Sequence, residues 1–161
     1  MKRDDLYGLP PEEFTKARDA LAKELRDAGK REAADEVKAL RKPTVSAWAV
    51  NQAARQRPQD VKRLVKAGDA LRKAQRAAVG GRKSKLREAT AAHRELVQDL
   101  TETAKAALDE RGGSTAAIVT RVAQTLRGAS IDKEHSKALV AGTLSEDVEQ
   151  TGFGPLLTPV D

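Results

Sequence analysis

The residues best suited to chemistry in this sequence are lysines and arginines concentrated in one stretch. Between Lys38 and Arg87 there are fifteen basic residues and two acids, Asp60 and Asp69, a local net charge of +13. The remaining residues carry a net charge of −7, so the overall value of +6 conceals a strongly dipolar molecule. Concentrated positive charge needs an anionic partner or a solvated surface. The chemistry that this basic block (residues 38–87) offers is the binding of anions.

Nine residues of the basic block are placed so that they should share one exposed surface. Five project away from the apolar seam of an expected helix, and four follow at the turn after it and at the start of the next helix. Lysines and arginines that neutralise phosphates release counterions, which gives affinity without reading base sequence. The candidate nucleic-acid-binding residues are Lys62, Arg63, Lys66, Lys73, Arg76, Arg82, Lys83, Lys85 and Arg87.

The positive charge of the basic block can also serve purposes that involve no nucleic acid. Cations at helix C-termini are favourable by ~0.3–1 kcal/mol each, which accounts for about five of the fifteen. Acids that follow Arg87 on the next helix could face the cations and cancel part of their field. The alternative function is therefore a protein-interaction scaffold or regulator that docks an acidic protein partner through the same surface.

No residues have the spacing of a catalytic or metal site. His93 and His135 lie on different expected helices, and the absence of Cys excludes disulfides and thiolate zinc sites. Gly80-Gly81-Arg82-Lys83-Ser84 lacks the spacing and the preceding strand of a phosphate-binding loop. We expect a non-enzymatic protein without catalytic residues, metal or cofactor, in which His93 is a core side chain satisfied by a neighbour.

The stretch that ends at Gln52 resembles a helix-turn-helix in its second half. Thr44 begins an expected helix, and Asn51 and Gln52 have the amide side chains that read adenine edges. The first half departs from the motif, because Asp35 falls where a small apolar residue is wanted. The interpretation that we favour is a proline-punctuated junction of two helices with Trp48 buried.

Helices should position these residues, because apolar residues recur every three or four positions and sustained alternation is absent. We predict an all-α fold in which short N-terminal helices pack on a long antiparallel helical hairpin, with a small C-terminal helical cap. Residues 1–142 should form one helical domain. The expected parts are N-terminal helices in 1–57, a hairpin in 58–111, C-terminal helices in 114–142 and a largely irregular tail in 143–161.

Composition bounds the partners further. Apolar residues make up 39% of the chain and aromatic residues 2%, which suits an extended helical shape or a homodimer better than a compact globule. No apolar run approaches the ~20 residues of a membrane-spanning helix. The first residues include Asp4 and Asp5 where a signal peptide needs an apolar stretch. We expect a cytoplasmic protein that does not bind membranes.

Four segments of the sequence resemble an uncharacterised family of helical proteins from high-GC bacteria. They are Glu36 to Gln52, Ala92-His93-Arg94, Arg121 through Ser130, and Gly142 to Gly152. The resemblance implies a helical fold and no particular activity.

A second resemblance concerns one expected helix. Arg94, Gln98 and Glu102 resemble part of a motif with which an anti-sigma-factor family binds cyclic di-GMP on a helical hairpin. Arg87 and Ala91 depart from the preceding positions of that motif. This resemblance implies a nucleotide ligand only as the most distant alternative.

Overall fold

The computed structural model describes residues 1–149, which form eight helices and no strand, so the predicted all-α fold class is confirmed. The elements are the 3₁₀ helix η1 (Arg3–Gly8) and the α-helices α1 (Pro11–Asp27), α2 (Arg31–Lys38), α3 (Val45–Gln56), α4 (Pro58–Val79), α5 (Ser84–Asp109), α6 (Ala116–Ile131) and α7 (Lys133–Ala141).

The helices begin where the local chemistry of the chain allows. Pro11 and Pro58 occupy the first positions of α1 and α4, where a missing N–H costs nothing. Thr44 caps α3, because its hydroxyl accepts a 3.1 Å hydrogen bond from the N–H of Ala47. Thr115 caps α6 in the same way. The starts at Thr44 and Pro58 agree with those expected from the sequence, whereas η1 was not predicted.

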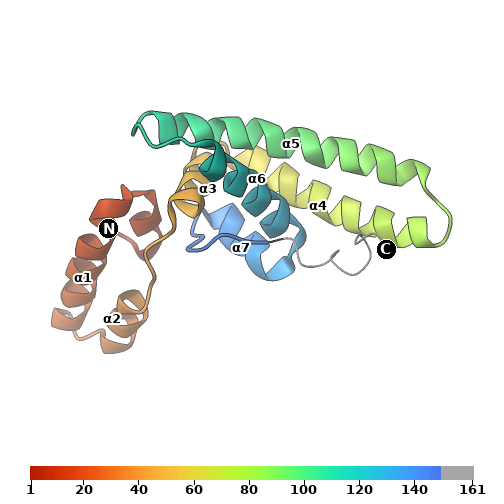
Figure 1. The fold of residues 1–161 in the computed structure, drawn as a ribbon. Helices are drawn as coiled ribbons and strands as arrows, with labels where there is room; N and C mark the ends of the chain where they lie inside the picture. Colours follow the sequence, from red (N-terminus) through yellow and green to blue (C-terminus); the bar gives the residue numbers. More distant parts are fainter. Residues whose placement is uncertain (150–161) are drawn as a thin grey trace, which may run out of the picture.

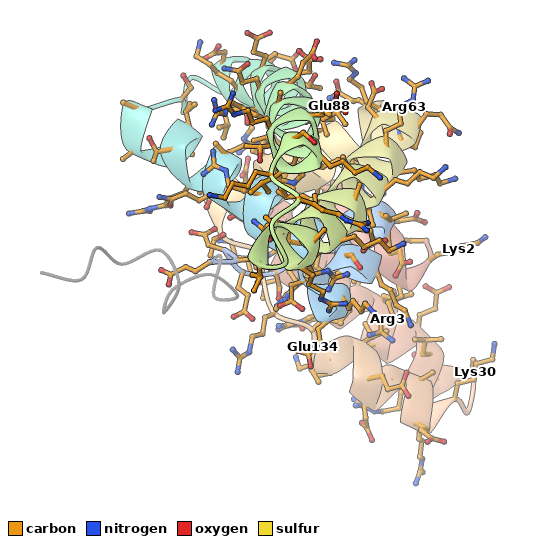
Figure 2. The ribbon with its side chains drawn as sticks, turned by 90° about the vertical axis from the view of Figure 1, so that its right-hand side faces the viewer. Lys2, Arg3, Lys30, Arg63, Glu88 and Glu134 are labelled. Carbon is orange, nitrogen blue, oxygen red and sulfur yellow. The ribbon has the colours of Figure 1, made fainter. Side chains whose placement is uncertain are left out.

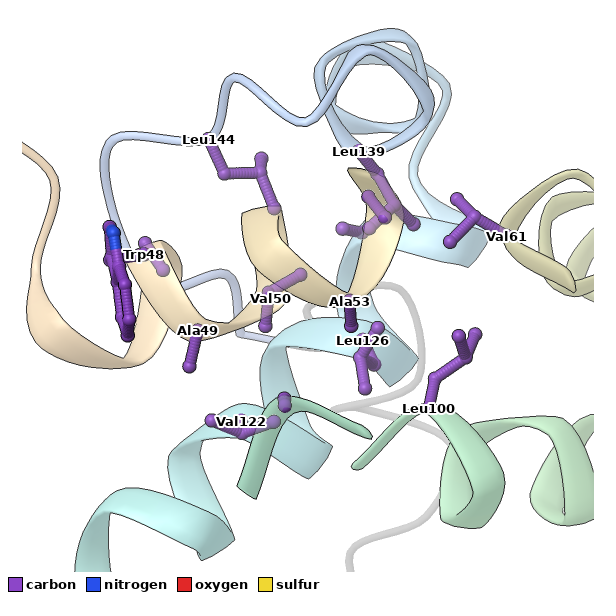
Figure 3. Close-up of a cluster of buried hydrophobic side chains, with 14 of the residues drawn as sticks. Trp48, Ala49, Val50, Ala53, Val61, Leu100, Val122, Leu126, Leu139 and Leu144 are labelled. Atoms are coloured by element: carbon purple, nitrogen blue, oxygen red, sulfur yellow. The ribbon is translucent and has the colours of Figure 1, made fainter. Parts of the chain in front are cut away.

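The apolar side chains form two clusters. The N-terminal cluster lies among η1, α1 and α2, which form the red and orange lobe of Figure 1. The larger cluster surrounds α3, which packs against α5, α6 and α7 and supplies Val50 and Ala53 to its centre (Figure 3). Trp48 lies at the edge of this cluster, near the lobe. Residues of the N-terminal cluster are Leu6, Tyr7, Phe14, Leu21, Ala22 and Val37.

α4 and α5 run side by side along their length and are joined by a short turn (Figure 1). Gly68 lets α6 come close to α4, because a Cβ at this position would lie 2.3 Å from the carbonyl oxygen of Ser130. Beyond this contact the ends of α4 and α5 extend away from the rest of the molecule (Figure 1). No helix within residues 1–149 is both long enough and apolar enough to cross a membrane.

Residues 143–149 form no helix, but they are held firmly against the core. Leu144 and Val148 are buried in the larger cluster. The main chain passes so close to α6 that a Cβ at Gly128 would lie 2.9 Å from the carbonyl oxygen of Val148. The rest of the predicted irregular tail, residues 150–161, lies outside the described residues.

Candidate nucleic-acid interface

The first five candidate residues lie on the outer face of α4, and all five are exposed. The apolar residues of α4 lie on the opposite side, against the other helices. Arg63 is seen on the surface in Figure 2, which views the molecule from the side of the turn between α4 and α5. Four of the five follow one line along the helix, about 21 Å long at ~1.5 Å per residue. We call this line the basic row: Lys62, Lys66, Lys73 and Arg76.

The other four candidate residues lie at the turn and at the start of α5. All are exposed, and they continue the positive surface past the end of α4. We call them the basic tip: Arg82, Lys83, Lys85 and Arg87. The structure therefore places the nine candidate residues along one edge and the tip of the α4–α5 pair.

Most of these cations have no partner within the protein. Arg63 pairs with Asp60, with 3.2 Å between Nη1 and Oδ1. Within residues 1–149, no ion pair or side-chain hydrogen bond involves the basic row or the basic tip. The other acid of the block, Asp69, forms an ion pair with the half-buried Arg72, with 2.7 Å between Oδ1 and Nη2. The acids of the basic block therefore leave eight exposed cations free.

The acids of α5 do not pair with these cations either. Asp109 forms an ion pair with Lys105 of its own helix, 3.2 Å between Nζ and Oδ2. Over the part of the chain that the structure describes, the other five acids at the end of the hairpin and along α5 form no ion pair. They are Glu88, Glu95, Asp99, Glu102 and Glu110, all of them exposed. Direct neutralisation of the basic row by α5 is thus absent from the described structure.

The start of α3 is not a base-reading helix. Asn51 is fully buried, and its amide exchanges two hydrogen bonds of 2.8 Å with the main chain of Leu144. The hydroxyls of Thr44 and Ser46 both donate to the carboxylate of Asp147. The hypothesis that this segment reads base edges is therefore wrong, because Leu144 occupies the amide of Asn51 and Asp147 occupies the hydroxyls at the start of the helix.

The helix-junction interpretation is confirmed instead. Trp48 is buried, and its indole N–H donates to the carbonyl of Leu9 at 2.8 Å. Gln52, the second expected base reader, donates to the carbonyl of Tyr7 at 3.1 Å. The guanidinium of Arg111 lies 5.1 Å from the centre of the indole ring, a cation–π contact. These contacts join the N-terminal lobe to the main cluster.

Arg55 also belongs to the basic block, but its contacts are internal. Its Nη2 donates to the carbonyl of Gly142 at the end of α7, at 3.3 Å, and to the carbonyl of Asp4 in η1. A cation is favourable beside a helix C-terminus, where main-chain carbonyls are left without partners. Arg55 therefore ties three segments together and is no part of the candidate interface.

His93 is a core side chain satisfied by a neighbour, as expected. It is 3% exposed, and its Nε2 lies 2.8 Å from the hydroxyl of Ser130. Because that hydroxyl donates to the carbonyl of Arg127, His93 must donate to it through Nε2. Burial, with a smaller contribution from the charge of Arg127, lowers the pKa of His93 to about 4. The imidazole is therefore neutral at pH 7.

A shallow cleft of about 440 Å³ lies between α5 and α6. Its charged lining balances two arginines against two carboxylates, and His93 does not line it. Arg94, Gln98 and Glu102 all line the cleft. Because the charges of its lining balance, the cleft offers no net positive charge to attract an anionic nucleotide. Among residues 1–149, no three His, Asp or Glu side chains are grouped closely enough to hold a metal ion. The charged lining residues are Arg94, Asp99, Glu102 and Arg127.

Comparisons of the chain with protein-family models, with curated proteins and with solved structures gave no significant match.

Proposed function

We propose that this protein is a non-enzymatic, nucleic-acid-associated protein that binds the phosphate backbone through the basic row and the basic tip. The observation that carries the proposal is the set of eight exposed cations without a protein partner in the described structure. Other polar groups of the same block, such as Asn51 and Arg55, are used in holding the fold. The free cations are those that a ligand can neutralise.

The physical basis of binding is the release of counterions. Each phosphate that a Lys or Arg neutralises frees part of the condensed ion atmosphere, so the affinity falls linearly in a log–log plot against salt. The slope is roughly −0.9 per phosphate on duplex DNA. Contacts from Lys and Arg to phosphates carry no sequence information, so binding should show little preference among base sequences.

The test is binding of a labelled nucleic acid by gel shift at low salt. A variant with Lys62→Glu, Lys66→Glu and Lys73→Glu should lose affinity by at least about a hundredfold, because three phosphate contacts become repulsive. The control changes the net charge equally, by reversing the exposed Lys16, Lys23 and Lys30 of the N-terminal lobe, which lies apart from α4 (Figure 1). Unchanged binding by the first variant, or equal losses in both, would contradict the proposal.

The alternative remains an acidic protein partner docked on the same surface. A pull-down that keeps an acidic protein after nuclease treatment, in a chain that binds no nucleic acid at low salt, would support the alternative over the proposal.

A further inference from the structure

The two long helices can be aligned level by level from their contacts with α6. Ser130 lies against Gly68 of α4 through its carbonyl group and against His93 of α5 through its hydroxyl. Gly68 and His93 therefore lie at the same height along the pair. The hydrogen bond of 3.4 Å from Arg57 to Thr103 supports the same alignment at the start of α4.

Counting outward from this level places an acid of α5 at the same height as each lysine of the basic row. Because the helices are antiparallel, steps backward along α4 correspond to steps forward along α5. Lys66 and Glu95 each lie two residues from the common level, on the same side of it. Lys62 and Asp99 each lie six residues from the level, on that same side, while Lys73 and Glu88 each lie five residues beyond it. We call Glu88, Glu95 and Asp99 the acidic row.

The acidic row lies on the outer side of α5. Its three members fall within one narrow arc of the helix, opposite the buried His93, Val97 and Leu100. All three are exposed, and none pairs with a lysine of α4 within residues 1–149. Figure 2 shows Glu88 on α5 and Arg63 on α4, both on the surface. The pair thus presents a positive line on the outside of α4 and a negative line on the outside of α5.

The distance between these lines decides what the acidic row does. The axes of packed helices lie about 8–10 Å apart, and charges on their outer faces lie farther apart than the axes, at or beyond the Debye length of about 10 Å at 0.1 M salt. At that separation the acids weaken the field of the basic row without cancelling it. A polyanion is attracted to α4 and repelled from α5, so it should lie along the side of α4 that faces away from α5.

The surface offers nothing on which bases can stack. Proteins that hold single strands gain about 1–3 kcal/mol per base from aromatic side chains. Within residues 1–149 the three aromatic side chains are all buried: Tyr7, Phe14 and Trp48. Phe153 lies outside the described residues. A ligand of this surface must therefore be held by its phosphates.

Base edges are also out of reach. A helix with its side chains is about 10–12 Å wide, so the tip formed by α4 and α5 is about twice that width. The major groove of DNA is about 12 Å wide and admits a single helix. A straight row about 21 Å long instead suits a rigid, regularly charged backbone, and duplex DNA carries one charge per about 1.7 Å of its length.

We propose that the ligand is double-stranded nucleic acid, held by its backbone along α4 and kept off α5 by the acidic row. This inference rests on the proposed function and narrows it to one class of nucleic acid and one side of the hairpin. It also assigns a role to Glu88, Glu95 and Asp99, which would set the direction of approach and limit affinity.

The first experiment compares a 25-base-pair DNA duplex with one of its own single strands, by fluorescence anisotropy over a range of salt concentrations. We expect duplex binding to be at least about tenfold tighter, with a steeper salt dependence, since each contact releases more counterion from a duplex. Two duplexes of unrelated sequence should bind equally. Equal or tighter binding of the single strand would overturn the inference and leave the proposed function standing. Binding of neither DNA would overturn both.

The second experiment removes the acidic row with Glu88→Gln, Glu95→Gln and Asp99→Asn. We expect duplex affinity to rise by about threefold at 0.1 M salt, and by more at lower salt, because the screened repulsion between the acidic row and the duplex is removed. The control neutralises the exposed Glu13, Glu24 and Glu32 of the N-terminal lobe, which should leave affinity within about twofold because that lobe lies beyond screening distance. Equal gains in both variants, or none in the first, would overturn the role of the acidic row.

Discussion

α3 and the outer face of α4 follow one another in the chain, and both are rich in groups able to bind a nucleic acid. In α3 these groups are bonded inward: Asn51 to Leu144, and Arg55 to the end of α7. On α4 the cations of the basic row point outward and have no partner in the described structure. The difference teaches that residue type identifies a candidate, whereas its hydrogen-bond partners decide whether it is available to a ligand.

The largest effect that tests this comparison is expected at Asn51. The change Asn51→Leu leaves the buried N–H and carbonyl of Leu144 without partners, at about 1–3 kcal/mol for each group. We expect the free energy of unfolding in urea to fall by about 4 kcal/mol. Lys66→Leu on α4, as the matched change, should alter it by less than about 0.5 kcal/mol. Similar losses at the two positions would remove the distinction between the regions.

The next largest effect concerns pH and the buried His93. Its pKa is about 4 in the fold, below the ordinary value near 6.5, so the unfolded chain binds the proton more readily. Stability is then full above about pH 6.5 and decreases as the pH falls towards 4, by up to about 3 kcal/mol.

The measurement is urea unfolding from pH 7 to pH 4, in the native protein and in a His93→Gln variant that keeps a donor for Ser130. The variant should lose this part of the pH dependence, while its carboxylates still titrate. Parallel curves for the two proteins would show that the fold does not hold His93 neutral.

A crossed pair of arginines sharpens the comparison. Arg55→Gln should lower the free energy of unfolding by about 2 kcal/mol, because its contacts with two main-chain carbonyls are lost, and should leave DNA affinity nearly unchanged. Arg76→Gln should do the reverse, with stability within about 0.5 kcal/mol and weaker binding. Chemical denaturation gives the free energy of unfolding of each variant, and DNA titration gives the affinity of each. If the Arg55 variant binds DNA more weakly under conditions in which it is fully folded, Arg55 belongs to the interface.

The smallest expected effect separates two neighbours on α4. Lys66→Gln should reduce the log–log slope of DNA affinity against salt by about one, the share of one phosphate contact, because Lys66 has no protein partner. Arg63→Gln should reduce it by less, since Arg63 already pairs with Asp60. The slopes of affinity against salt, measured side by side, provide the check. A greater reduction for Arg63 would mean that the ion pair opens on binding.

The helices and the exposure of the candidate residues could be predicted because both depend on local patterns. Pro11, Pro58 and Thr44 set helix starts through their own backbone and side-chain chemistry. The full buried face of α5 could not be predicted from its periodicity. It includes Val97 and Ala104 because α5 packs against α3 and α6 as well as α4, which widens the face that is covered.

The part that could not be predicted depends on residues far apart in the chain. Ser46 bonds to Asp147 across 101 positions, and no pattern near either residue signals it. Asn51 was considered as a base reader for the same reason, because its partner Leu144 lies on a segment expected to be irregular. Whether the α5 acids would pair with the basic row was also open, because that depends on how far each helix is rotated about its axis.

The segment 143–149 has a consequence for the order in which this chain can fold. α3 is the centre of the larger cluster, yet Leu144 and Val148 complete its surroundings and Asp147 bonds to the hydroxyls at its start. Contacts between residues about a hundred positions apart are costly in loop-closure entropy and slow to form. During synthesis, α3 stays partly exposed until the chain has been extended to Val148, because Leu144 and Val148 cover part of its surface. The central core should therefore close late and in one cooperative step.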